Sequence, residues 1–573
     1  MQYIMQRLTL SQDHIKRHAK ESRKHNYTLL LVPRVSTLVS RILEEEGVLG
    51  DVTISSYNLQ FIPIAEDVIS LEHENTLREL WVRLATLLSR QNPKASNGSS
   101  PEPLSSSSSK IDSLIILDRR VDMITPLLTQ LTYEGLVDEL VGIKNCKSFN
   151  TVTHVELPLS ILSPQTAGAT SAPTASTSTT PAAIPVVAVK KDAKKKHHLT
   201  TATDPLFAEL RDLNFSSVGK KLNQVARRLN EDYKTNLQGQ TVAQLRDFVG
   251  KLGGLQTEHQ ALGLHTRLSE LIVPLTRTDV FNKSLEIQQN LLASYEVTAQ
   301  LNAIEDLIAQ GADMQIVLRL LCLASLTAGG VKAKNLENIK REILQAYGYE
   351  YLPLLLSLSA PSLSVLFPNP LPPSTPSSVA ALKYPFAQLR KSLRLLIDDN
   401  PEALDEVEND ISFVYSGYAP ISVRLVQCIA QKGGVISNPA EKEKASNEAN
   451  SAGDQKKLSI GKVQAHPIVG WKGFEDVVSV IPGQTVEIVQ KTSNNVVASG
   501  PLAALGSTTT TTVVFFLGGC TYTEIAALRW VGRQNKGRKF LVATTGIVSG
   551  ASIIEGIAGI GQSAGPKTTA ATV

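Results

Sequence analysis

The sequence is poor in cysteine and contains no long hydrophobic run. Its 4 cysteines among 573 residues are widely separated, with no C-x-x-C pair and no adjacent histidine. This spacing argues against a zinc site and a disulfide framework, and it favours a reducing compartment. No uninterrupted apolar stretch reaches the roughly 18 residues of a membrane span, and the first residues lack a signal-peptide core. We therefore expect any membrane association to be peripheral.

Catalytic signatures are also lacking. The Gly518-Gly519 turn does not have the G-x-G-x-x-G spacing, and no G-x-S-x-G or H-E-x-x-H motif occurs. Two segments come near the phosphate-loop pattern, but GRQNKGRK has Arg538 in place of the lysine, and GIGQSAGPKT has a proline before its lysine. The net charge of +4 is small for this length, which argues against a general nucleic-acid binder. We therefore expect no enzyme activity, no cofactor, no metal site and no nucleic-acid partner.

What the sequence does contain is an α/β unit at Ser113–Gly142. The short apolar run Leu114–Leu117 predicts a buried strand. Thr125-Pro126 offers an N-cap hydroxyl and a proline at the first helical position, so a helix is expected to follow directly. The acidic residues of that helix are expected on its outer side, namely Glu134, Asp138 and Glu139.

Polar residues gather at the carboxyl end of this strand, where open α/β sheets bind small ligands. Asp118 and Asp122 could therefore serve an enzyme of the nucleotide-fold type. The alternative is that both aspartates cap turns and pair with Arg119 and Arg120, which would fix the corner. Because no glycine-rich loop and no metal-ligand partner lies beside them, the structural interpretation is favoured.

The chain on either side of this unit differs in character. Tyr27–Pro33 predicts a strand followed by a helix, and the abrupt start predicts that the beginning of an α/β domain is missing. Residues 166–203 read as a disordered low-complexity insert, and 436–459 as a disordered charged loop. The basic run Lys190–His198 could contact acidic lipid or act as an import signal, but a solvated patch in a disordered loop is favoured.

From Asp204 the pattern is helical. This residue offers an N-cap before a proline, and apolar residues at helical spacing predict two long arms joined at Lys234–Gln240. The predicted element is an αα-hairpin over 204–272. His259 and His265 are 6 residues apart, which would place them off a common helix face. Both are therefore expected to be solvated rather than to bind a metal.

Several segments resemble the Sec-one/Munc-eighteen-like (SM) family, whose members regulate SNARE-mediated membrane fusion. LDRRVDMITPLLTQLTYEGLVDEL resembles the family's LDR-x-x-D-x-x-TP-x-x-x-QLTYEG signature. FFLGGCTYTEIAALRWV, in which Thr521 and Glu524 have capping-box spacing, and KFLVATTGIVSG resemble later family segments. DISFVYSGYAPISVRLVQ is similar to the vacuolar protein sorting branch, whose members are subunits of the HOPS and CORVET tethering complexes. The similarity extends from about Lys20 to Gly550 outside the low-complexity inserts.

This resemblance implies an arch-shaped fold of α/β and all-α domains. The strand at Leu114 would share a sheet with the strands at Val513 and Phe540. The first domain, whose start is expected to be missing here, forms one wall of a syntaxin-binding cleft in relatives. The resemblance divides the chain into a first α/β domain remnant at 1–75, a split α/β second domain at 76–165 and 460–573, and a helical third domain at 204–435.

The resemblance also implies a non-catalytic SNARE chaperone on the cytoplasmic side of vacuolar, lysosomal and late endosomal membranes. The helical hairpin and the cleft beneath it would hold SNARE helices in parallel. Basic hairpin residues are expected at the charged rim of that site, namely Arg227, Arg228 and Arg246.

A second implied partner is an α-solenoid subunit of the same complexes. Family members dock on it through the stretch that matches Tyr418–Arg424 here. Tyr418, Ile421 and Arg424 are therefore expected at that interface, and packing of the domain core is the alternative for them.

Overall fold

The chain divides by its internal contacts into two units, Met1–Pro63 and Ile64–Val573. In the first unit, β1 (Tyr27–Leu31) and β2 (Val52–Ser56) pair in parallel, and α2 (Thr37–Glu45) lies between them in sequence. The strand predicted at Tyr27 is therefore confirmed. The computed structural model describes residues 27–31, 37–45, 52–56, 62–72, 111–144, 153–158, 194–235, 242–360, 365–370, 384–396, 410–431, 463–464, 471, 475–481, 483–488 and 510–558.

A sheet with the strand order β3-β4-β11-β9-β5 organises the second unit among the described residues. β11 pairs in parallel with β4 and with β9, and β9 pairs in parallel with β5. Leu114 lies opposite Val513, and Phe540 lies opposite Thr512, so the predicted sheet is confirmed. The strands are β3 (Ile62–Ala65), β4 (Val68–Ser70), β5 (Ile111–Asp118), β9 (Thr510–Leu517) and β11 (Arg538–Thr544).

The short strand β4 corrects the predicted boundary at residue 75. Val68 of β4 lies opposite Val542 of β11 and is 1% exposed, so this segment belongs to the sheet that the second domain was expected to form. A strand of three residues is too short to show an alternating pattern in the sequence.

Helices follow the strands and build the rest of the second unit. Every residue of α11 from Val317 to Thr327 is buried, so this helix crosses the main core. Asp313 caps its start by accepting from the Gln315 amide, and Gly329 ends it in the left-handed conformation. The helices are α4 (Tyr133–Leu140), α6 (Pro205–Leu210), α7 (Phe215–Thr235), α8 (Val242–Thr276), α9 (Asp279–Ala293), α10 (Val297–Ala309), α11 (Met314–Ala328), α12 (Ala333–Tyr347), α13 (Leu352–Leu358), α15 (Phe386–Ser392), α17 (Ile421–Gln431), α19 (Glu475–Val480), α20 (Tyr522–Gln534) and α21 (Gly550–Ala558).

The helix expected directly after Thr125-Pro126 begins later. Thr125–Leu127 is a single 3-10 turn, and α4 starts at Tyr133 with Thr132 as its N-cap. The Thr125 hydroxyl donates to the Asp122 carboxylate at 2.6 Å, so it does not cap a helix.

The end of the basic run is also ordered, which corrects the prediction of a disordered loop there. Lys194–His198 forms β7, which pairs antiparallel with β6 (His154–Pro158). Buried Leu157 and Leu199 anchor this small sheet in a core shared with α7 and α8. Residues 166–193 of the predicted insert and the loop at 436–459 lie outside the described residues.

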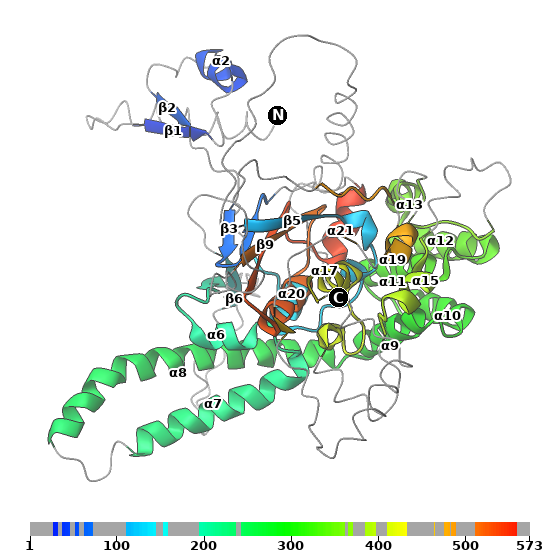
Figure 1. Cartoon of the computed structure of the whole chain (residues 1–573). Helices are drawn as coiled ribbons and strands as arrows, with labels where there is room; N and C mark the ends of the chain where they lie inside the picture. Colours follow the sequence, from blue (N-terminus) through cyan, green and yellow to red (C-terminus); the bar gives the residue numbers. More distant parts are fainter. Residues whose placement is uncertain are drawn as a thin grey trace, which may run out of the picture. The chain divides into compact units, whose positions relative to one another are not determined.

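The helices α7 and α8 lie alongside each other as a long pair, drawn in green tones in Figure 1. The predicted first arm is interrupted, because α6 ends at Leu210 and α7 begins at Phe215. None of the described helices is long and apolar enough to cross a bilayer. The apolar residues that pack the pair include Val218, Leu222, Val225 and Leu229 from α7 and Leu268 and Ile272 from α8.

Candidate functional site

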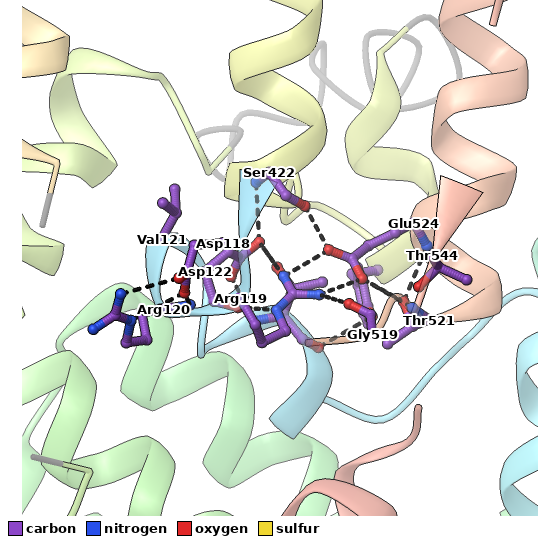
Figure 2. A network of polar contacts seen from close by, with 12 residues as sticks. Asp118, Arg119, Arg120, Val121, Asp122, Ser422, Gly519, Thr521, Glu524 and Thr544 are labelled. Carbon is purple, nitrogen blue, oxygen red and sulfur yellow. Dashed lines mark hydrogen bonds and ion pairs between the residues drawn. The ribbon is translucent and has the colours of Figure 1, made fainter. Parts of the chain in front are cut away.

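The corner after β5 holds a buried ion network, shown in Figure 2. Arg119 is 2% exposed, and its two terminal nitrogens donate to the Glu524 carboxylate at 2.9 and 2.8 Å. Its Nε donates to the Asp122 carbonyl at 2.9 Å, and Nη1 also donates to the Gly519 carbonyl at 3.2 Å. The bidentate pair connects the corner after β5 to the start of α20, about 400 residues later in the chain.

The capping box predicted at the start of α20 is confirmed. The Glu524 amide donates to the Thr521 hydroxyl at 3.1 Å, and the Thr521 amide donates to the Glu524 carboxylate at 2.9 Å. The same carboxylate accepts from the Ser422 hydroxyl of α17. Burial alone would raise the pKa of Glu524, but the Arg119 guanidinium outweighs it and holds the pKa below its usual value.

Both predicted ion pairs of the corner are present. Asp118 accepts from the Arg120 amide at 2.9 Å and pairs with its guanidinium at 3.0 Å. Asp122 lies 3.6 Å from the Arg119 guanidinium, and its carboxylate accepts from the Thr125 and Ser422 amides at 2.9 and 3.0 Å. Burial raises the pKa of Asp122. The oxygens of Asp122 are thus used within the protein, as the structural interpretation predicted.

Metal-ligating side chains do not converge elsewhere in the part of the chain that the structure describes. No group of three or more histidine, cysteine, aspartate or glutamate residues there is arranged to hold a metal ion. The described cysteines, Cys322, Cys428 and Cys520, are buried, and burial raises the pKa of each thiol. A raised pKa keeps these thiols protonated, which makes them poor nucleophiles.

The residues predicted to meet the solenoid partner lie inside the protein. Tyr418, Ile421 and Arg424 are 1%, 0% and 2% exposed. The Tyr418 hydroxyl is 3.4 Å from that of Thr125, and Arg424 donates two hydrogen bonds to Asp410 at 2.6 and 2.7 Å. Tyr418 thus contacts the corner and Arg424 is paired inside the protein, as the core alternative describes, and partner contact by these side chains stays a prediction.

The expectation of a solvated histidine is wrong for His265 and confirmed for the exposed His259. His265 is 0% exposed; its Nδ1 is 2.8 Å from the Tyr133 hydroxyl, and its Nε2 is 2.9 Å from the Asp204 carboxylate. Burial would raise the pKa of Asp204, but the hydrogen bond and charge of His265 lower it overall. The sequence carried a signal, since His265 is on the same helical stripe as Leu268, three residues later.

The hairpin's basic residues lie on its outer surface where they are described. Arg227 is exposed, and Arg228 pairs with Glu258 across the two helices at 2.6 Å, with both side chains about half exposed (57% and 44%). Arg246 is in α8, in a part whose side chains lie outside the description. The structure therefore places two of the three predicted residues at exposed positions of α7.

Glu134 does not lie on an outer surface as predicted. It is 7% exposed and 3.5 Å from Arg529, which also pairs with Asp67 at 2.7 Å and Asp212 at 2.9 Å. Burial raises the pKa of Glu134 to about 7. The helix α4 packs against both α20 and α8, so the face expected to meet solvent is covered.

The sequence matches a known family. The model of the Sec1 family matches residues 1–556 of this chain. The chain belongs to the Sec1 family. Membership accounts for the predicted combination of α/β and helical parts, and that predicted fold class is confirmed.

Individual relatives match over most of their length. The chain is 31% identical to the rat vacuolar protein sorting-associated protein 33A, over 93% of this chain and 81% of that protein. It is 28% identical to vacuolar protein sorting-associated protein 33 of Schizosaccharomyces pombe, over 94% and 84%. Among solved structures, the Unc18–syntaxin 1 complex of Monosiga brevicollis matches with 17% identity and a TM-score of 0.49, over 94% of this chain and 84% of that one.

Proposed function

We propose that this Sec1-family chain is a non-catalytic regulator that binds SNARE proteins during vesicle docking and membrane fusion. Its relatives are named vacuolar protein sorting-associated proteins 33 and 33A, which supports a role in traffic to the vacuole, lysosome and endosome. In this proposal the chain is a subunit of a HOPS- or CORVET-type tethering complex and is peripheral on those membranes.

The exposed outer face of the α7–α8 hairpin carries the proposal. The apolar residues of α7 pack inward, so its outer face presents Arg227 and the Arg228–Glu258 pair to solvent. A SNARE segment that folds on binding loses conformational entropy, and a preformed helical surface lowers the cost of ordering it. The hairpin would hold SNARE helices in parallel by helix-in-groove contacts with a charged rim.

The base of the hairpin is suited to hold this surface in one orientation. His265 connects α8 to Tyr133 of α4 and to Asp204, the N-cap of α6, through its two ring nitrogens. Leu268 and Ile272, on the same side of α8, are 0% exposed. A rigid base limits the orientations that the hairpin can adopt. Less conformational entropy is then lost when a helix pair binds to it.

The test is charge reversal of the rim in the full-length protein. We expect Arg227→Glu/Arg228→Glu/Arg246→Glu to weaken binding of a parallel SNARE helix pair by about tenfold, since exposed ion pairs contribute up to about 1 kcal/mol each. The matched control, Lys332→Glu/Lys334→Glu/Arg341→Glu, reverses three exposed charges in and directly before α12 and should leave binding unchanged. Equal binding by the triple variant and the wild type would remove these residues from the proposal.

For the α-solenoid partner, we propose contact through the Tyr418–Arg424 segment. Because Tyr418 is 1% exposed, Tyr418→Asp would disturb the core as well as any interface. Tyr418→Phe removes only the hydroxyl, and Ile421→Val only one methylene, so both should fold. Reduced co-purification with the solenoid subunit at an unchanged unfolding temperature would support the contact, and unchanged co-purification of both variants would contradict it.

The enzyme alternative at Asp118 and Asp122 is disfavoured by the geometry of the corner. Arg120 pairs with Asp118, and the hydrogen bonds of Thr125 and Ser422 occupy Asp122. We expect no change in unfolding temperature on adding ATP, GTP or Mg²⁺, and a saturable increase with any of them would favour the enzyme alternative.

A further inference from the structure

The small sheet of β6 and β7 presents a fixed group of cations, which we call the β7 surface. Lys195, Lys196 and His198 are exposed on β7. Lys144 has a side chain 58% exposed, and Arg267 contributes a half-buried guanidinium from α8. The β7 surface therefore combines cations from β7, from the chain before β6, and from the base of the hairpin.

The backbone under this surface is held in place by pairing and by burial. Lys195 lies opposite Leu157, and Lys196 lies opposite Glu156. Leu157 is 0% exposed and Leu199, directly after the strand, is 4% exposed. The lysines are therefore attached to an ordered strand, so binding there does not first require ordering of the chain.

The charge of the β7 surface is only partly balanced, because Glu156 is the acid that Lys144 and Lys196 face there among the described residues. Glu156 accepts from Lys144 at 2.7 Å, and this hydrogen bond holds the pKa of Glu156 below its usual value. Burial lowers the pKa of His197, and the positive charges of Lys195 and Arg267 lower it further. Within the described residues, no ion pair involves Lys195, Lys196 or Arg267, so the surface has a net excess of positive charge.

We propose that the β7 surface binds the anionic phospholipid headgroups of a membrane. Lysines are compact point charges that suit a fluid layer of phosphates, whereas fixed bidentate recognition of one carboxylate or phosphate favours arginine. Strand β7 itself carries no tyrosine, phenylalanine or tryptophan on which a nucleic-acid base could stack. This membrane contact is additional to SNARE binding and does not depend on it.

The test compares binding of the full-length protein to vesicles of neutral phosphatidylcholine and to vesicles that also contain phosphatidylserine. We expect tighter binding to the anionic vesicles, and binding that weakens as salt is raised. Each lysine near an anionic surface contributes about fivefold, so Lys195→Glu/Lys196→Glu should weaken binding by about thirtyfold or more. The matched control Lys334→Glu/Arg341→Glu makes the same change in net charge on α12 and should bind within about twofold of the wild type.

Three outcomes would overturn the assignment. The wild type could show no preference for anionic vesicles, the α12 control could lose as much binding as the β7 variant, or soluble polyglutamate could bind the surface as tightly as the vesicles do. Lys195→Gln/Lys196→Gln provides a second variant if charge reversal prevents folding. Binding of a SNARE helix pair in solution, measured on the same β7 variant, should be unchanged, which separates this proposal from the function of the hairpin.

Discussion

The corner network and the hairpin use the same kind of charged side chain in opposite ways. Arg119 is 2% exposed and bidentate to Glu524, whereas Arg228 meets Glu258 with both side chains about half exposed (57% and 44%). A buried pair is costly to break because the remaining charge has no water, whereas an exposed pair contributes little to stability. The corner thus stabilises the fold, and the hairpin leaves its charges available to a partner.

The largest effect is expected from breaking the corner. Arg119→Ala leaves Glu524 buried without its partner, so the free energy of unfolding should fall by about 3–5 kcal/mol. Urea unfolding measures this change, with Arg228→Ala as the exposed control. A loss below about 1 kcal/mol for Arg119→Ala would mean that burial does not distinguish the two regions.

A second prediction concerns the raised pKa of Glu134. Its pKa is about 7 in the folded protein and near 4.5 in the unfolded chain, so the folded state favours the protonated form. The charged form therefore costs stability, and that cost grows as pH rises from about 4.5 to about 7 and is fully present above pH 7. Glu134→Gln removes the charge and should raise the free energy of unfolding by up to about 3 kcal/mol at pH 8.

The same variant should have almost no effect at pH 4.5, where the carboxyl is protonated in the folded state. Unfolding curves at the two pH values check the sign. A Glu134→Gln variant that is less stable than the wild type at pH 8 would show that attraction to Arg529, 3.5 Å away, outweighs the burial of the charge.

For the base of the hairpin we expect a stability loss between those of the corner and of the exposed rim. His265→Phe keeps the buried ring but removes both hydrogen bonds, leaving Tyr133 and Asp204 without their partner. We expect a loss of about 2–3 kcal/mol in the free energy of unfolding. The distance distribution between spin labels on α7 and α12 should also broaden, because the angle of the hairpin is less restricted; an unchanged distribution would contradict a positioning role.

The smallest effect on stability is expected on the rim. Arg227→Glu/Arg228→Glu should change the free energy of unfolding by less than about 1 kcal/mol, because both side chains are exposed. Binding of SNARE helices should nevertheless weaken severalfold, as measured by fluorescence titration. A large loss of stability without a loss of binding would reverse the distinction between corner and hairpin.

The sequence predicted correctly those strands and helix caps that are specified by residues close together in the chain. The apolar run at Leu114 predicted a strand, and Thr521 with Glu524 predicted a capped helix, whereas the place of the Leu114 strand beside the Val513 strand came from the family resemblance. The start of α4 was mispredicted because Asp122 binds the Thr125 hydroxyl, and Asp122 is itself fixed by Ser422, 300 residues away. No local pattern contains that contact.

Strand β7 and His265 were harder to predict, for two different reasons. Strand β7 consists of lysines and histidines, and only its pairing with β6 and its buried neighbour Leu199 make it a strand. His265 was interpreted through its spacing from His259, although its spacing from Leu268 indicates a buried stripe. Strand β7 could not be predicted because it depends on tertiary pairing. The burial of His265 was missed because the wrong spacing was used to interpret it.

The most direct measurement is binding of the purified full-length chain to two ligands of equal length and charge, a parallel SNARE helix pair and an unrelated parallel coiled coil. We expect the SNARE pair to bind at least about tenfold more tightly, and the difference to shrink in the Arg227→Glu/Arg228→Glu/Arg246→Glu variant. Equal affinity of the intact chain for the two ligands would contradict a role in SNARE recognition.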